Sequence, residues 1–168
     1  MAPLTSAGLP DHVADVETLE NLLSWPSQSL IDNLAALDGD IIILGVGGKI
    51  GPCLARMAKR AAPGKRIVGV ARFSNSEVKR RLEDWGVETL ACDLLDRQAV
   101  AELPKLANVI YMAGRKFGTD GDEPFTWAMN VYVPALVAEA FAQSRIVAFS
   151  TLCVYPFTDV TGPLCKED

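Results

Sequence analysis

The chain has 168 residues, a formal charge of −5 and 49% apolar residues, which suits one domain with a substantial buried core. An acidic chain without a basic tract lacks the positive surface that nucleic-acid binding requires. No window is long and apolar enough to span a membrane, and the N-terminal segment has neither the basic nor the apolar region of a signal peptide. We therefore expect a cytoplasmic protein with no nucleic-acid partner and no membrane contact.

The cysteines give no pattern typical of a metal site. Cys53, Cys92, Cys153 and Cys165 lie far apart, without a C-x-x-C pair, and His12 is the single imidazole available to them. This composition predicts reduced thiols and no bound metal.

Residues 1–38 precede the first predicted strand and are expected to form a helical extension rather than a second domain. Apolar residues fall on one helical face over 16–23 and again over 30–37, and Pro26 separates the two stretches. Two short amphipathic helices are predicted. They either cover an edge or face of the sheet or, together with Trp25, form a contact between subunits.

A strand, a glycine-rich turn and a helix follow one another within residues 40–60. The apolar run 41–44 predicts a strand. Helical periodicity then begins, with apolar residues on one side at Ile50, Leu54, Met57 and Ala58. The turn between them carries Gly45, Gly47, Gly48 and Gly51.

This arrangement is typical of a pyrophosphate site. The backbone must approach the phosphate oxygens closely, which side chains on the turn would prevent, and the helix N-terminus offers unpaired N–H groups. The spacing Gly45-x-x-Gly48-x-x-Gly51 differs from the G-x-G-x-x-G of ordinary dehydrogenases, although Gly45-x-Gly47 also occurs. The alternative is a tight turn without a ligand.

Strands and helices alternate along the rest of the chain. The predicted strands are 66–71, 87–91, 108–112 and 146–149, and the predicted helices are 76–85, 96–103 and 124–142, the last with a kink at Pro134. Because each strand is short and apolar, the pattern predicts parallel strands with helices on both faces. We expect an α/β fold with a doubly wound, Rossmann-like parallel sheet over residues 39–168.

In such a sheet, ligands bind at the carboxyl ends of the strands. About twenty residues beyond Gly51, where an NAD enzyme usually places an acid, this chain has Arg72. Lys49 in the turn adds a second positive charge, and the pair suits a 2′-phosphate. The sequence therefore favours NADP(H) over NAD(H), unless both side chains are simply solvated.

Other strand ends carry further candidates. Asp93 can accept a hydrogen bond from an adenine amino group while Leu94 packs on the ring, although Asp93 could equally cap a helix or turn. Ala113 and Gly114 leave room for a cofactor to pass. Ser150 and Thr151 follow the fifth predicted strand, where a hydroxyl can bind a substrate hydroxyl or carbonyl, or satisfy the backbone.

Five motifs in order resemble the N-terminal part of the extended short-chain dehydrogenase/reductase family, the NAD(P)-dependent epimerases and dehydratases. They are GVGGKIG at 45–51, CDL at 92–94, YMAG at 111–114, Asn130, and FSTLCVYP at 149–156. The resemblance covers about residues 40–168. It implies a nicotinamide cofactor, a hydroxyl-bearing small-molecule substrate such as a nucleotide sugar, and reversible hydride transfer, and it leaves both a monomer and a homodimer open.

The resemblance also implies roles for individual residues. Thr151 is the expected catalytic residue, which polarises the reacting C–O group. Gly45, Gly48 and Gly51 would hold the pyrophosphate, Asp93 and Leu94 the adenine, and Ala113 and Gly114 the nicotinamide side. The full set of expected cofactor-binding residues is Gly45, Gly47, Gly48, Lys49, Ile50, Gly51, Arg72, Asp93, Leu94, Ala113, Gly114, Asn130 and Ser150.

The sequence departs from the family at the Tyr-x-x-x-Lys pair, which should follow Thr151. The residues four positions after Tyr111, Tyr132 and Tyr155 are Arg115, Leu136 and Asp159. We therefore expect the cofactor half of a longer enzyme, truncated after the fifth strand and inactive alone. The alternatives are a non-catalytic NADP(H)-binding sensor and an interaction domain whose glycine turn is purely structural.

Overall fold

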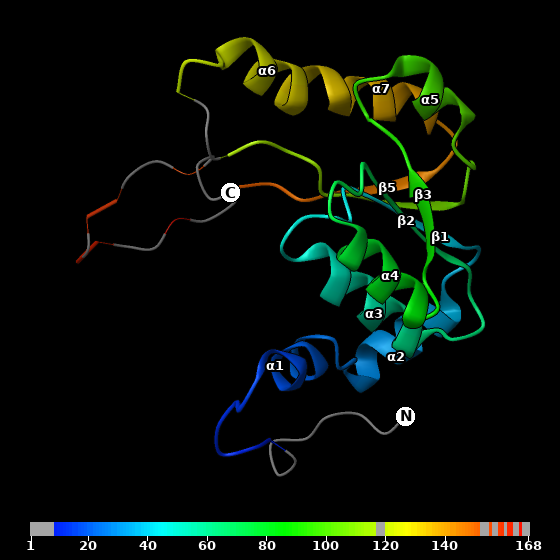
Figure 1. Ribbon diagram of the computed structural model, residues 1–168, viewed down its shortest axis with the longest axis vertical. Coiled ribbons are helices and arrows are strands. Elements are labelled where there is room, and N and C mark those ends of the chain that lie inside the picture. Colours follow the sequence, from blue (N-terminus) through cyan, green and yellow to red (C-terminus); the bar gives the residue numbers. More distant parts are fainter. Residues whose placement is uncertain are drawn as a thin grey trace.

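The computed structural model describes residues 9–116, 120–151, 155, 158–159, 161–162 and 165. Its centre is a five-stranded sheet in the order β3-β2-β1-β4-β5, in which every neighbouring pair is parallel (Figure 1). The strands are β1 (Ile41–Leu44), β2 (Ile67–Ala71), β3 (Glu88–Ala91), β4 (Asn108–Tyr111) and β5 (Arg145–Ala148). The predicted doubly wound α/β fold is confirmed.

Helices form layers on both faces of this sheet (Figure 1). They are α1 (Val16–Leu23), α2 (Gln28–Ala36), α3 (Gly51–Ala61), α4 (Ser76–Asp84), α5 (Arg97–Glu102), α6 (Glu123–Trp127) and α7 (Val133–Ala140), with a π-helical turn η2 (Ala128–Tyr132) between the last two. α3 and α4 cover one face, and α5 with the α6–η2–α7 segment covers the other. None of the helices in the described part of the chain is both long and apolar enough to cross a membrane.

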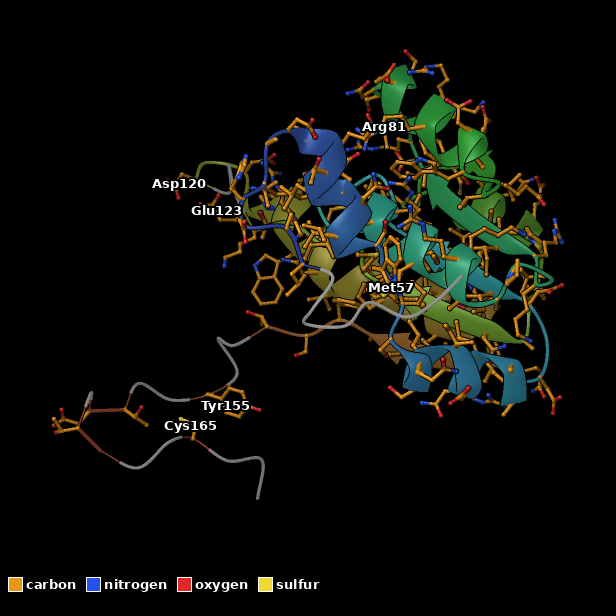
Figure 2. All side chains as sticks on the ribbon, turned by 90° about the horizontal axis from the view of Figure 1, so that it is seen from below. Met57, Arg81, Asp120, Glu123, Tyr155 and Cys165 are labelled. Atoms are coloured by element: carbon orange, nitrogen blue, oxygen red, sulfur yellow. The ribbon has the colours of Figure 1, made fainter. Side chains whose placement is uncertain are left out.

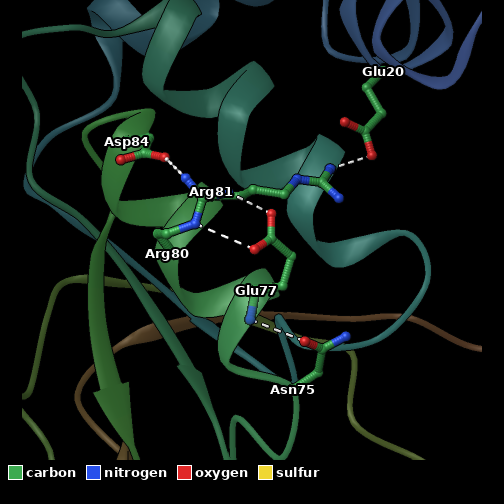
Figure 3. Close-up of polar contacts among 6 residues, drawn as sticks. All are labelled: Glu20, Asn75, Glu77, Arg80, Arg81 and Asp84. Carbon is green, nitrogen blue, oxygen red and sulfur yellow. Dashed lines mark hydrogen bonds and ion pairs between the residues drawn. The ribbon is translucent and has the colours of Figure 1, made fainter.

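Side-chain caps fix where several helices begin. Asp15 accepts a hydrogen bond from the Thr18 N–H at the start of α1, and Asn75 accepts one from the Glu77 N–H at the start of α4 (Figure 3). Asp96 caps α5, where its side chain accepts hydrogen bonds from the Gln98 and Ala99 N–H groups. Such caps satisfy N–H groups that have no partner inside the helix.

The core has two layers because β1 is buried on both faces. On one side, Leu44 and Val109 pack with Val137 and Phe141, which come from α7 and the residue that ends it. On the other side, α3 meets the sheet through small residues, Gly51, Ala55 and Ala58. The predicted apolar side of this helix holds in part: Ala58 is buried and Leu54 packs against the core, whereas Ile50 is 61% exposed.

The expectation that every strand is apolar and buried is also wrong at the two edges. All four residues of β5 are exposed, and Glu88 of β3 forms an exposed ion pair with Arg66. Edge strands have a neighbour on one side alone, so their side chains are less enclosed.

The long helix predicted over 124–142 is divided into α6, η2 and α7. Pro134 lies in the first turn of α7, directly after the π-helical turn. A proline has no N–H to donate and clashes with the preceding turn of an α-helix, which a wider π-turn relieves. The predicted irregularity at this proline thus takes the form of a π-turn.

The N-terminal extension forms the two predicted helices, but they pack on α3. In α2, Leu34 and the following Leu37 reach the core, whereas α1 lies on the outer side of α3 and α4 (Figure 1). The prediction that these helices cover the sheet is therefore wrong for α1, which packs on other helices. At the other end, Tyr155 and Cys165 lie away from the sheet and its helices (Figure 2).

Candidate functional site

A cavity of about 360 Å³ opens at the carboxyl ends of β1 to β4. β2 lies on one side of β1 and β4 on the other, so the strand order reverses direction between β1 and β4. Parallel sheets bind ligands at such a reversal. The predicted cofactor-binding residues that line the cavity are Gly45, Gly47, Gly48, Arg72, Asp93, Leu94, Ala113 and Gly114.

Two glycines of the turn are required by the fold itself. Gly45 has φ +94°, and a Cβ on it would lie 2.6 Å from the Ala113 backbone nitrogen. A Cβ on Gly51 would lie 2.0 Å from the Val46 carbonyl oxygen. The missing side chain at Gly45 lets the turn pack closely on the loop that follows β4. The missing side chain at Gly51 lets the start of α3 pack closely on the turn.

Gly48 differs, because the fold does not explain its missing side chain. A Cβ there would meet nothing closer than the Gly45 oxygen at 3.6 Å, which is ordinary contact. Gly48 lines the cavity, and α3 begins three residues later without a side-chain cap among the described residues. An exposed glycine before an uncapped helix start suits close approach of an anion.

The end of β2 supplies the positive charge of the cavity. Arg72 is exposed on its wall and makes no hydrogen bond or ion pair to any described residue. Phe73, Ser74 and Asn75, which the sequence did not identify, line the same wall. Phe73 has φ +50°, a rare conformation for an aromatic residue, and its half-buried ring packs against the core.

The end of β3 supplies a carboxylate and an apolar surface. Asp93 is exposed, and its Oδ1 accepts a hydrogen bond of 3.1 Å from the Leu95 N–H. Asp93 therefore shapes a turn, as one of its two predicted roles required, and it also lines the cavity, where its contact with an adenine stays a prediction. Beside it, burial and the carboxylate of Asp93 raise the pKa of the Cys92 thiol, which keeps it protonated at neutral pH.

Asn130 lies outside the cavity lining and acts on the loop that follows β4. Its Oδ1 accepts from the Arg115 N–H at 2.7 Å, and its Nδ2 donates to the Arg115 carbonyl at 2.8 Å. A Cβ on Gly114 would lie 3.3 Å from the same Oδ1. Asn130 thus fixes the position of Gly114, which does line the cavity.

The remaining predicted residues are not part of the cavity lining. They are Lys49, Ile50, Gly51, Ser150 and Thr151. Ser150 and Thr151 are exposed just beyond β5, and Lys49 is exposed in the turn. The cavity therefore brings together the groups expected around a nucleotide, and it does not include the expected catalytic hydroxyl.

Tyr111 is unsuited to proton transfer. Its side chain is 7% exposed, and its hydroxyl has no hydrogen-bond partner among the described residues. Burial raises its pKa to about 12.

No group of metal-ligating side chains occurs within the described residues. Cys53 and Cys92 are free thiols there, and Cys153 lies outside the described part.

Comparison with solved structures places this geometry in a known fold. ADP-L-glycero-D-manno-heptose-6-epimerase from Helicobacter pylori is 18% identical, with a TM-score of 0.64 over 77% of this chain and 44% of its own. The fold is Rossmann-like. The resemblance that the motifs indicated is therefore confirmed at the level of fold.

Two further structures of this fold contain nucleotides. The Bordetella bronchiseptica enzyme WbmG in complex with NAD and UDP is 21% identical, with a TM-score of 0.57 over 70% of this chain and 39% of its own. BdcA from E. coli in complex with NADPH is 18% identical, with a TM-score of 0.52 over 65% and 50%. This chain thus spans half or less of each of the three proteins. No family model and no curated protein sequence matches it.

Proposed function

We propose that this chain is the cofactor-binding part of an NAD(P)-dependent epimerase, dehydratase or reductase of the extended short-chain dehydrogenase/reductase type. Gly48 carries the proposal: it lines the cavity, and the packing around it leaves space for a side chain that the sequence does not supply. A bare backbone at that point is what a bound pyrophosphate requires.

The cavity walls fit the parts of a nicotinamide dinucleotide. Gly47 and Gly48 would face the pyrophosphate, Asp93 and Leu94 the adenine, and Gly114 the nicotinamide side. Leu94 is buried and provides an apolar surface, whereas Asp93 is exposed and accepts hydrogen bonds. The polar and apolar groups of the cavity are therefore distributed as a dinucleotide requires, with a charged pyrophosphate at one place and a flat adenine base at another.

Arg72 favours NADP(H) over NAD(H) in this proposal. It has no partner among the described residues, and the Ser74 hydroxyl lines the same wall. A guanidinium binds a phosphate through charge-assisted hydrogen bonds, whereas a ribose 2′-hydroxyl is usually held by an acid. Lys49 is not part of the cavity lining, so it would attract the phosphate through long-range electrostatics and not through direct contact.

The proposed reaction is reversible hydride transfer on a hydroxyl-bearing substrate such as a nucleotide sugar. The nicotinamide, when bound, supplies the hydride acceptor or donor. Thr151 would donate a hydrogen bond to the substrate oxygen. Tyr111 is excluded as the proton-transfer group because it is buried, with its pKa raised to about 12. These activities are proposed for the complete enzyme.

The experiment that tests cofactor binding compares two glycine-to-valine substitutions by fluorescence titration with NADPH. Gly48→Val places a branched side chain in the cavity and should weaken binding at least tenfold, about 1.4 kcal/mol. Gly64→Val is the matched control, because a Cβ at Gly64 has no atom within 4 Å. Both variants should keep the far-ultraviolet circular dichroism of the parent. Equal NADPH affinity in Gly48→Val and the parent would refute the pyrophosphate assignment.

A further inference from the structure

Consecutive residues at the end of β2 line one wall of the cavity. They are Ala71, Arg72, Phe73, Ser74 and Asn75. In an extended strand, successive side chains point to opposite faces of the sheet, so a continued strand would bring every second residue to this wall. The chain turns within this segment, and the turn decides which polar groups reach the cavity.

Phe73 makes this turn in a conformation that its residue type disfavours. Its φ is +50°, and within the described part of the chain it is the one residue other than glycine with a positive φ. A side chain with a Cβ clashes with the following carbonyl oxygen in this region, so aromatic residues rarely adopt it. A residue held in such a conformation beside a cavity indicates a functional constraint.

The backbone is fixed on both sides of Phe73. Before it, the Cys92 N–H donates to the Ala71 carbonyl at 3.0 Å, which ties the end of β2 to the end of β3. After it, the Asn75 side chain accepts from the Glu77 N–H at 2.9 Å and caps α4 (Figure 3). The short segment between these two points therefore depends on the dihedral angles of Phe73 for its path.

The Phe73 ring anchors this segment. It is half-buried and packs against the core cluster on the α3–α4 side of the sheet, as do Val78 and Trp85. The Phe73 N–H makes no hydrogen bond to any described residue. Apolar packing of the ring is therefore the contact that offsets the disfavoured φ.

We propose that Phe73 is a positioning residue for cofactor selection, an inference that rests on the proposed function. The left-handed turn places the exposed Arg72 guanidinium and Ser74 hydroxyl on one wall, where both can donate to a 2′-phosphate. Phe73 acts through these two residues and not through its own contact with the phosphate. With a negative φ at Phe73, the chain beyond Arg72 would leave the wall, and NADPH would lose its advantage over NADH.

Two substitutions separate the backbone conformation from the ring. Phe73→Gly removes the ring but allows a positive φ without strain, so no anchor is needed, whereas Phe73→Pro removes the ring and fixes φ at about −65°. Titration of the full chain with NADPH and with NADH gives the ratio of the two dissociation constants. We expect Phe73→Gly to keep this ratio within about twofold of the parent, and Phe73→Pro to lower the preference for NADPH about tenfold or more.

Trp85→Leu is the matched control for loss of aromatic packing. Trp85 packs against the same core cluster and lies outside the cavity lining, so this variant should lower the urea midpoint without changing the ratio. If Phe73→Pro does not fold, Phe73→Ala takes its place. Alanine also disfavours a positive φ, so the ratio should fall in the same direction by a smaller factor.

The outcomes distinguish this inference from the proposed function. A parent ratio that persists in Phe73→Gly and in the proline or alanine variant overturns the role of Phe73. So does an equal fall in both, because the ring and not the backbone would then select the cofactor. A parent that binds both cofactors equally overturns the inference and leaves cofactor binding intact. A parent that binds neither cofactor refutes the proposed function, and this inference with it.

Discussion

Arg72 owes its position to the residue that follows it. Phe73 turns the chain at φ +50°, and its half-buried ring packs on the core beneath β2. A left-handed conformation at an aromatic residue costs on the order of 1 kcal/mol, which the ring packing must offset. The backbone at Arg72 is thereby fixed, and its side chain is exposed on the cavity wall with no competing partner among the described residues.

Arg72→Asp should reverse the order of cofactor affinity. Loss of charge-assisted hydrogen bonds to a 2′-phosphate costs about 1.5–3 kcal/mol, so NADPH should bind roughly 10- to 100-fold more weakly. NADH should bind as well as before or better, because an aspartate can accept from the ribose 2′-hydroxyl. Parallel titrations with both cofactors measure the ratio. Arg97→Asp, on α5 outside the cavity lining, controls for net charge and should leave the ratio unchanged.

At this scale the sequence predicts the glycine turn and much of the cavity, but not the reason for each glycine. The same spacing contains Gly45 and Gly51, which the packing requires, and Gly48, which it does not. Local sequence cannot separate these cases, because the contacts come from Val46 and Ala113 in three dimensions. Phe73 was missed for a related reason: aromatic residues rarely adopt positive φ.

Asn130 lies in η2, the element that connects α6 to α7. Its side-chain amide forms hydrogen bonds with both the N–H and the carbonyl of Arg115, so it connects the helical segment to the loop after β4. Arg115 is also held from α6, because its guanidinium lies 4.7 Å from the centre of the Phe125 ring. The helical segment thereby determines where the loop after β4 lies, and with it Gly114 at the cavity.

Asn130→Ala should loosen this loop without unfolding the sheet. Two exposed hydrogen bonds are lost, and water can replace them at the Arg115 backbone, so each costs less than the usual net value of about 1 kcal/mol. NADPH affinity should fall several-fold, whereas the urea midpoint should change little. Asn130→Asp keeps the acceptor for the Arg115 N–H and should retain more affinity than the alanine variant. Unchanged affinity in Asn130→Ala would show that the loop is held by other contacts.

Element order and type were predicted well because strands buried on both faces are short apolar runs, as in β1 and β4. Prediction failed where burial depends on a neighbour. The pattern cannot show that β3 and β5 are edge strands, nor that α1 turns its apolar face outward. In α1, three hydrogen bonds from Arg60 and an ion pair with Arg81 decide the orientation, and these arginines come from later elements.

At the scale of the whole molecule, four layers are stacked: the α5–α7 segment, the sheet, the α3–α4 pair, and α1 (Figure 1). The cavity lies at the sheet edge, and α1 docks on the far side of α3 and α4, so the extension contributes no residue to the cavity lining. Arg60 is the main link between these outer layers. It bonds Asn21 and Ser24 and lies 5.7 Å from the centre of the Trp25 ring.

Arg60→Ala should release α1 from α3 while the cofactor cavity remains intact. The substitution removes three hydrogen bonds and leaves the buried Ser24 hydroxyl with bonds to the carbonyls of Glu20 and Asn21 alone. Each lost bond costs about 1 kcal/mol, enough to raise local opening roughly 100-fold. Hydrogen exchange should therefore accelerate in α1 and stay unchanged in β1, with NADPH affinity equal to that of the parent.

Arg80→Ala is the matched control for Arg60→Ala. Arg80 is an exposed arginine whose ion pairs with Glu77 and Asp84 stay within α4 (Figure 3). Exposed pairs of this kind contribute less than about 1 kcal/mol, so exchange in α1 should not change. Equal protection of α1 in both arginine variants would mean that other contacts, such as the Glu20–Arg81 pair, suffice to hold the helix. Faster exchange of α1 in Arg60→Ala but not in Arg80→Ala would show that the bonds from Arg60 hold the helix on α3.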